Sequence, residues 1–250
     1  MDYANEGSLK NFLSKIVKFN WHTRLNLLND IIAGLEKIHD TNLVHCNLHD
    51  GNILTKRIRN NYNGLDLFQN FVDDLRSCQP FEYHPSASSN NESIYGVLPF
   101  IAPEILGGEP YTPESDIYSC SMIMWELASG ISPFYGREHD TQLMLSIYKG
   151  ERPGIIQKTP QCYVDLMKAC WDSDPSERPT ATEISTIVQN WIYYTLKYYE
   201  AESPLDIKQE IDRKLIKENI DQVIEEIDDV QLQNDTIEFW NADKDLTQCF

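Results

Sequence analysis

The sequence predicts a mainly α-helical fold with short β-hairpins beside one polar loop. Apolar residues recur at spacings of three and four in several segments, which is the period of an amphipathic helix. Residues 117–127 are apolar nearly all round, which is typical of a helix buried at the centre of a core. Two short apolar runs flank the polar loop at residues 44–54, so short strands are expected there.

Five more segments show the helical period. One covers residues 9–16, and a longer one covers residues 21–38 and leads into the polar loop. Three others follow the central helix, at residues 143–148, 164–171 and 184–191. Together they are enough to enclose a sizeable hydrophobic core.

The overall composition is that of a soluble globular protein. Of 250 residues, 41% are hydrophobic and 24% are charged, and the formal net charge is -18. This charge disfavours nucleic acid and anionic membranes as partners, because both are polyanions. The six cysteines include no C-x-x-C pair, which suits reduced thiols better than disulfides or a zinc site. Because the sequence shows no leader and no apolar run of membrane length, we expect a cytoplasmic protein.

The polar loop reads VHCNLHDGNIL and resembles the catalytic loop of protein kinases. That family carries H-R-D-x-x-x-x-N, in which the Asp accepts the substrate hydroxyl proton and the Asn holds Mg²⁺. His45 and Asn52 occupy the positions of the motif's His and Asn. Cys46 stands at the Arg position and Asn47 at that of the catalytic Asp. The loop therefore keeps the frame of the motif and lacks its acid.

Four further motifs in the same order support the resemblance. They lie at residues 102–104 (APE), 115–119 (SDIYS), 170–172 (CWD) and 178–179 (RP). Together they resemble the large lobe of the tyrosine-kinase-like group, and they imply a kinase-like C-terminal lobe over residues 1–194. The resemblance also implies a buried ion pair between Glu104 and Arg178 and a cap from Asp116 on the backbone amides of the polar loop.

The first residues resemble the kinase hinge, with Met1 at the gatekeeper position. This resemblance implies that the Asp2 carbonyl and the Ala4 N–H face an adenine edge, with Leu54 as a further cofactor-binding residue. The sequence contains no G-x-G-x-x-G loop and no V-A-I-K lysine, so we expect the small lobe to be absent. ATP and Mg²⁺ are the cofactors that the family implies, with weak or no binding expected. A truncated gene model and a genuine short product both explain this start.

Three loop residues are the catalytic candidates, namely Asn47, His49 and Asn52. The Asn47 amide has nearly the shape of a carboxylate but is a far weaker base. His49 stands where Ser/Thr kinases commonly have a Lys that meets the transferring phosphate, and a neutral imidazole supplies less positive charge. Cys46 replaces the Arg that in many kinases pairs with a phosphorylated activation loop. We therefore expect a loop that folds without performing the chemistry.

Asn52 and Asp74 are the predicted metal ligands. Asp74 follows a short apolar strand, whereas the alternative, Asp66, follows Asn63-Gly64, which is a turn signal. Asp74 lies 22 residues after Asn52 (74 minus 52), so this choice predicts an enlarged turn through residues 57–70. Either choice lacks the glycine of the family's D-F-G motif, which restricts the backbone at that point.

Residues 195–250 form a predicted acidic C-terminal extension. Residues 201–250 hold 14 acidic and 5 basic side chains, a net charge of -9, which is half of the charge of the whole chain. From Ile207 to Val230 the apolar residues step by three and four, which predicts an amphipathic helix. This helix could pack on its own lobe, stay solvated or associate with another chain through residues 205–230.

These observations predict a pseudokinase or kinase-derived interaction module with protein partners in signalling. A first alternative is a fragment of an ATP-dependent protein kinase that phosphorylates Ser/Thr or Tyr of proteins, with Asn52 and Asp74 holding the metal. A second alternative is a scaffold that binds through its acidic C-terminal helix. The transcript upstream of Met1 would separate the first two hypotheses most directly.

Overall fold

A computed structural model of the chain describes residues 4–59, 66–81 and 96–201. The chain divides into two compact units, residues 1–192 and 193–250. The second unit is described only at its beginning, where it continues the last helix. The amphipathic helix predicted within residues 205–230 lies outside the described residues.

Two helices precede the polar loop, as predicted. Helix α1 (Leu9–Ile16) buries its four apolar residues, and α2 (Trp21–Asp40) buries a longer stripe of Leu and Ile side chains. Helix α2 begins where the Asn20 side-chain oxygen accepts a hydrogen bond from the Thr23 backbone N–H at 2.9 Å. It ends at Asp40 with Thr41 as its C-cap, and Asn42 then takes a positive φ of 58° that turns the chain toward the polar loop.

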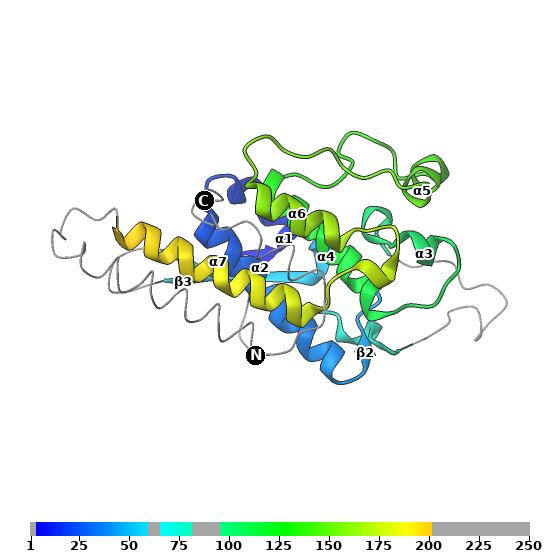
Figure 1. The fold of residues 1–250 in the computed structure, drawn as a ribbon, viewed down its shortest axis with the longest axis horizontal. Coiled ribbons are helices and arrows are strands. Elements are labelled where there is room, and N and C mark those ends of the chain that lie inside the picture. Colours follow the sequence, from blue (N-terminus) through cyan, green and yellow to red (C-terminus); the bar gives the residue numbers. More distant parts are fainter. Residues whose placement is uncertain (1–3, 60–65, 82–95, 202–250) are drawn as a thin grey trace. The chain divides into compact units, whose positions relative to one another are not determined.

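Helix α4 (Pro113–Ser129) is the buried central helix that the sequence predicts. It packs against α1, α2 and α6 (Figure 1). Most of its side chains are buried. Thr112 and Ser115 form a capping box at its start, and Gly130 ends it with a φ of 74°. A Cβ atom at Gly130 would lie 2.3 Å from the Val17 side chain, so this position requires glycine.

Four other helices complete the helical part of the fold. They are α3 (Pro103–Leu106), α5 (Thr141–Tyr148), α6 (Gln161–Cys170) and α7 (Ala181–Ala201). The last three confirm the predicted helices, and α7 extends well beyond the predicted 184–191. None of the helices in the described part of the chain combines the length and the apolar composition that a transmembrane helix needs.

Two small antiparallel sheets lie beside the polar loop. The larger has the order β1 (Gly7–Ser8), β3 (Ile53–Arg59), β4 (Asp66–Val72). In the smaller, β2 (Leu43–Val44) pairs with β5 (Gln79–Pro80). Short 3-10 turns connect strands of the two sheets: η1 (Asp50–Asn52) lies between β2 and β3, and η2 (Leu75–Ser77) lies between β4 and β5. Short hairpins beside the loop were predicted, and the fold is mainly helical.

The enlarged turn predicted through residues 57–70 is wrong. Strands β3 and β4 pair from Ile53 opposite Val72 out to Arg59 opposite Asp66, so most of this segment is a regular hairpin. Cross-strand hydrogen bonds satisfy the backbone here better than an open turn would. The hairpin also explains the 22-residue separation between the predicted metal ligands, because the chain runs out along β3 and returns along β4.

Candidate functional site

The polar loop of residues 44–54 is held in shape by one carboxylate from the central helix. Asp116 accepts hydrogen bonds from the His45 N–H at 2.7 Å and from the Cys46 N–H at 3.1 Å. His39 Nε2 lies 3.0 Å from the same carboxylate. These contacts confirm the predicted cap. They fix the backbone of the loop through a residue that lies on another element and takes no part in the predicted chemistry.

His45 connects the loop to the end of β4. Its side chain is fully buried, and Nε2 lies 2.8 Å from the carbonyl oxygen of Asp73. Because a carbonyl oxygen only accepts, Nε2 carries the proton, and Nδ1 is left to accept from the Asn47 N–H at 3.3 Å. His45 was predicted as a member of the motif, but this contact was not predicted, because the Asp73 carbonyl is a backbone group.

Asn47, at the predicted base position, faces the predicted metal ligand Asp74. Asn47 Nδ2 donates to Asp74 Oδ2 at 3.3 Å, and the Asn47 carbonyl accepts from Asn52 Nδ2 at 2.9 Å. The Asn47 amide oxygen lies close to Gly96, because a Cβ atom built at Gly96 would be 3.7 Å from Asn47 Oδ1. The structure thus brings Asn47, Asn52 and Asp74 together.

Asp74 is held by short-range hydrogen bonds in a left-handed backbone conformation, with φ 58° and ψ 43°. Ser77 Oγ donates to Asp74 Oδ2 at 2.7 Å, and Arg76 Nε lies 3.8 Å from Oδ1. The hydrogen bond from Ser77, followed by that from Asn47 and the charge of Arg76, lowers the pKa of Asp74 below its ordinary value. The contact of Ser77 with Asp74 was not predicted from the sequence.

The hairpin register decides which acid lies near Asn52. Ile53 pairs with Val72, so Asp73 and Asp74 follow β4 directly beside Asn52, and the Asp73 N–H donates to the Asn52 carbonyl at 2.8 Å. Asp66 pairs with Arg59, six residues further along β3, which is about 20 Å at the rise of an extended strand. Asp66, the alternative ligand, therefore lies at the end of the hairpin that is far from Asn52.

A hollow at this point is lined by Asn52, Asp73, Asp74, Leu75 and Arg76. Asn52 uses its amide nitrogen within the loop, so its Oδ1 and the Asp74 Oδ1 can serve as oxygen ligands. Such hard oxygen donors fit Mg²⁺, which binds through one or two carboxylates together with water and phosphate oxygens. Within the described residues, no group of three or more His, Cys, Asp or Glu side chains is placed to hold a metal. The set fits a magnesium ion with few protein ligands.

His49 turns back toward its own loop. Its Nδ1 accepts from the Gly51 N–H at 3.0 Å and lies 3.6 Å from Asp50 Oδ1, and its ring centroid lies 6.2 Å from that of Phe100. The imidazole therefore acts as a cap of η1 in this structure. Its predicted contact with a phosphate stays a prediction.

The predicted cofactor-binding residues are only partly within the described chain. Asp2 lies outside the described residues. The Ala4 carbonyl accepts from the Gly7 N–H at 3.2 Å in a turn before β1, and Ala4 is half-buried. Leu54 is half-buried in β3, where it pairs with Ser8. Ala4 and Leu54 thus belong to one local structure around β1, and their role in binding adenine stays a prediction.

Cys46 is half-buried beside the negative charge of Asp116. Its backbone φ is 64°. Cys46 lines a second hollow together with Asn47, Gly96 and several residues that follow Gly96 in the chain. Burial, and then the charge of Asp116, raises the pKa of the Cys46 thiol well above its ordinary value. The thiol is therefore protonated at neutral pH and is a poor nucleophile.

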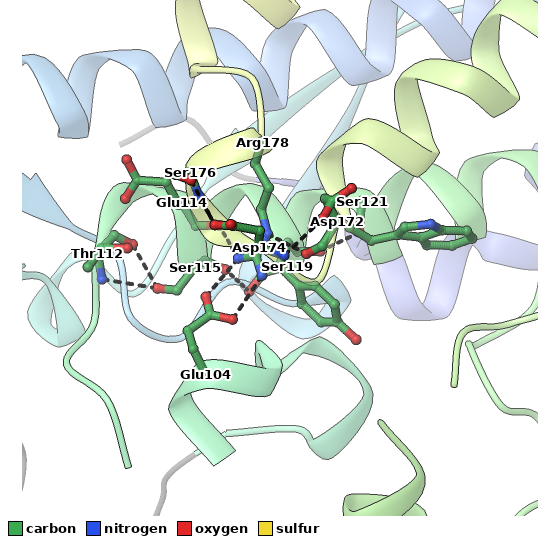
Figure 2. A network of polar contacts seen from close by, with 12 residues as sticks. Glu104, Thr112, Glu114, Ser115, Ser119, Ser121, Asp172, Asp174, Ser176 and Arg178 are labelled. Carbon is green, nitrogen blue, oxygen red and sulfur yellow. Dashed lines mark hydrogen bonds and ion pairs between the residues drawn. The ribbon is translucent and has the colours of Figure 1, made fainter. Parts of the chain in front are cut away.

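Behind the site, Glu104 and Arg178 form the predicted buried ion pair (Figure 2). The two guanidinium nitrogens donate to the two carboxylate oxygens at 2.7 and 2.8 Å, and the Arg178 side chain is fully buried. Arg178 also donates to the carbonyls of Asp172 and Glu114, each at 2.9 Å. One guanidinium thus connects α3, the start of α4 and the turn after α6.

Comparisons with known proteins agree with this geometry. Residues 1–192 match the protein kinase domain family. The chain is 31% identical over 194 residues to the probable serine/threonine-protein kinase drkD of Dictyostelium discoideum, covering 76% of this chain and 14% of that protein. It is 31% identical over 186 residues to mitogen-activated protein kinase kinase kinase 7 of Drosophila melanogaster, covering 72% of this chain and 25% of that protein.

A plant protein is similar over the same region. The serine/threonine/tyrosine-protein kinase HT1 of Arabidopsis thaliana is 27% identical over 192 residues, which cover 76% of this chain and 46% of that protein. The chain therefore spans less than half the length of each of these three relatives.

Proposed function

We propose, from the premise that this chain belongs to the protein kinase family, that it is a pseudokinase, a kinase-like module that binds protein partners in signalling. The observation that carries the proposal is Asn47 at the position of the catalytic base, with its amide nitrogen donating to Asp74. The motifs at residues 102–104, 115–119 and 170–172 support placing it in the large lobe of the tyrosine-kinase-like group.

The chemical argument concerns the proton of the substrate hydroxyl. An aspartate accepts that proton as the hydroxyl attacks, whereas a neutral amide has no basic site of comparable strength. Loss of a general base removes roughly 10²- to 10⁴-fold in rate. Magnesium, when bound at Asn52 and Asp74, would neutralise phosphate charge, but it would not supply the missing base. The Asp116 cap holds the backbone of the loop in place, so the loop can fold although the catalytic base is missing.

Phosphotransfer assays test this proposal. With MgATP and generic protein substrates, we expect the unaltered chain to show no activity above background. Background is defined by Asn52→Ala, which removes a predicted metal ligand. Activity of the unaltered chain that disappears in Asn52→Ala would overturn the proposal.

The second candidate function is that of an ATP-dependent protein kinase acting on Ser/Thr or Tyr. What favours it is the intact pair of Asn52 and Asp74 lining one hollow, together with relatives whose names describe kinases. Transcript sequence upstream of Met1 tests it, because an in-frame glycine-rich loop and a strand lysine would supply the phosphate-gripping parts. In such a longer protein, phosphotransfer activity gained with Asn47→Asp would show that the missing acid at position 47 alone prevents the reaction.

We also propose a cytoplasmic location and protein rather than nucleic acid or membrane partners. The net charge of -18 supports this, because polyanionic surfaces repel an acidic protein. Association through residues 205–230 is part of the same proposal. Sedimentation of the full chain at low and high salt, with and without those residues, tests it.

A further inference from the structure

The Asp74 carboxylate is already surrounded by donors from its own chain. Ser77 Oγ donates to Oδ2 at 2.7 Å, Asn47 Nδ2 donates to the same oxygen at 3.3 Å, and Arg76 lies near Oδ1. A second bond from Ser77 Oγ goes to the Asp74 carbonyl at 2.8 Å and closes the η2 turn. Of these contacts, only that from Asn47 links Asp74 to the polar loop.

The chemistry at position 47 sets what this link requires. An amide presents N–H donors to a carboxylate, so the two side chains attract each other without further help. A carboxylate at position 47 would place two like charges at about the same distance, which is unfavourable without a cation between them. The choice between amide and acid therefore decides whether the junction between the polar loop and η2 is stable without a metal ion.

We propose that Asn47 is a positioning residue that holds the Asp74 carboxylate to the polar loop in place of a cation. The inference deepens the proposed function, because it describes the state of the same site in a protein that transfers no phosphate. Asn52 Oδ1 and Asp74 Oδ1 can still bind a metal, but the arrangement of the loop and η2 does not depend on it. An aspartate at position 47 would make the same arrangement dependent on metal.

Thermal melting and Mn²⁺ binding by the full chain test the proposal. We expect the unaltered protein to melt at the same temperature in EDTA and in MgCl₂. The variant Asn47→Asp should melt lower in EDTA, recover in Mg²⁺ or Mn²⁺, and bind Mn²⁺ about tenfold more tightly in electron paramagnetic resonance titrations, because added ligand charge strengthens hard-cation sites. Asn47→Ala should melt lower than the unaltered protein in both buffers, with no recovery on adding metal.

A matched control separates this effect from added charge in general. Asn190→Asp adds the same charge at an exposed position of α7 and should leave both melting and Mn²⁺ affinity unchanged. If Asn47→Asp melts and binds Mn²⁺ as the unaltered protein does, the proposal is wrong. Such a result leaves the proposed function intact, since that proposal depends on phosphotransfer alone.

Hydrogen exchange of the unaltered protein gives a second measurement that needs no variant. The Ser77 N–H donates to the Asp74 carbonyl at 3.0 Å, so its exchange rate reports whether η2 is ordered. We expect equal protection in EDTA and in Mg²⁺. Protection that rises tenfold or more with Mg²⁺ would overturn the proposal, because it would show that the metal, and not Asn47, orders this turn.

Discussion

At the scale of single residues, two acidic groups of this protein differ sharply in their surroundings. Glu104 is largely buried against a fully buried guanidinium, whereas Asp74 lies at a partly exposed turn with neutral donors from Ser77 and Asn47. Burial decides how much each contact contributes to stability, because water can replace hydrogen bonds at an open site but not in the core. Arg178 should therefore matter more for folding than any residue of the polar loop.

We expect Arg178→Ala to destabilise the protein by about 3 to 5 kcal/mol, because it leaves the Glu104 carboxylate and two backbone carbonyls without their donor. Asn47→Ala should cost about 1 kcal/mol, because solvent can take its place. Denaturant melts measure both. The control is Arg137→Ala, whose ion pair with Glu151 is exposed and should contribute at most about 1 kcal/mol. Equal midpoints for Arg178→Ala and Arg137→Ala would contradict the prediction.

The roles of residues that belong to a family motif could be predicted from the sequence. The Asp116 cap and the Glu104–Arg178 pair are both confirmed, since each motif fixes the type of residue and its partner. The contacts of His45 with the Asp73 carbonyl and of Ser77 with Asp74 were missed. Both depend on where a turn places a backbone group or a small side chain, and single-sequence patterns carry little information about that.

At the scale of elements, the β3–β4 hairpin is anchored to α2 through buried polar groups. The Asn70 N–H donates to Asp30 at 2.9 Å, and the Asn70 side chain bonds to the Leu27 carbonyl and to Thr55. Short hairpins were predicted beside the loop, but the long regular pairing of β3 with β4 was not, because the polar residues of β4 interrupt the apolar alternation by which strands are recognised. Asn70, one of these polar residues, bonds to α2.

Stability should depend on pH through this anchor. Burial raises the pKa of Asp30 to about 6, above its ordinary 3.8, so the folded protein holds a proton there that the unfolded chain releases. This contribution is fully present below about pH 4 and is lost as pH rises through about 6. Two pH units correspond to about 3 kcal/mol, and because Asp30 is only partly buried we expect about 1 to 2 kcal/mol.

The variant Asp30→Asn tests this expectation, because it stays neutral and can still accept from the Asn70 N–H. It should be more stable than the unaltered protein at about pH 8, and the difference should shrink at about pH 5.5. Asp40→Asn, which removes a carboxylate at an exposed position of the same helix, is the control for the change in net charge. A difference for Asp30→Asn that stays constant with pH would contradict the assignment.

At the scale of the whole molecule, the residues proposed to bind nucleotide come from parts of the chain that lie far apart in sequence. The candidate residues Ala4, Leu54, Asn52 and Asp74 are contributed by the turn before β1, by β3 and by the ends of the polar loop and β4. The sequence holds no glycine-rich loop or strand lysine of the kind that grips phosphates in the family. Binding of ATP should accordingly be weak.

We expect a dissociation constant for MgATP on the order of millimolar or weaker, which corresponds to a binding free energy of about -4 kcal/mol. At a concentration equal to that constant, the ligand stabilises the fold by only about 0.4 kcal/mol. Thermal melts with millimolar MgATP should therefore shift little, and Asn52→Ala should shift no more. A rise of many degrees in the unaltered chain, absent in Asn52→Ala, would show a far stronger site.

The Asp116 cap has a consequence for how this chain can change over generations. Because one carboxylate on α4 fixes the backbone of the polar loop, the loop keeps its path whichever side chain stands at position 47. Asn47→Ala should cost only about 1 kcal/mol, and an acid at position 47 should be tolerated in Mg²⁺, so selection on abundance acts weakly at this position. Loss of the Asp116 carboxylate would leave two backbone N–H groups of the loop without their acceptor, so selection acts more strongly there. A lineage can therefore exchange acid for amide at position 47 and back again while the scaffold around it persists.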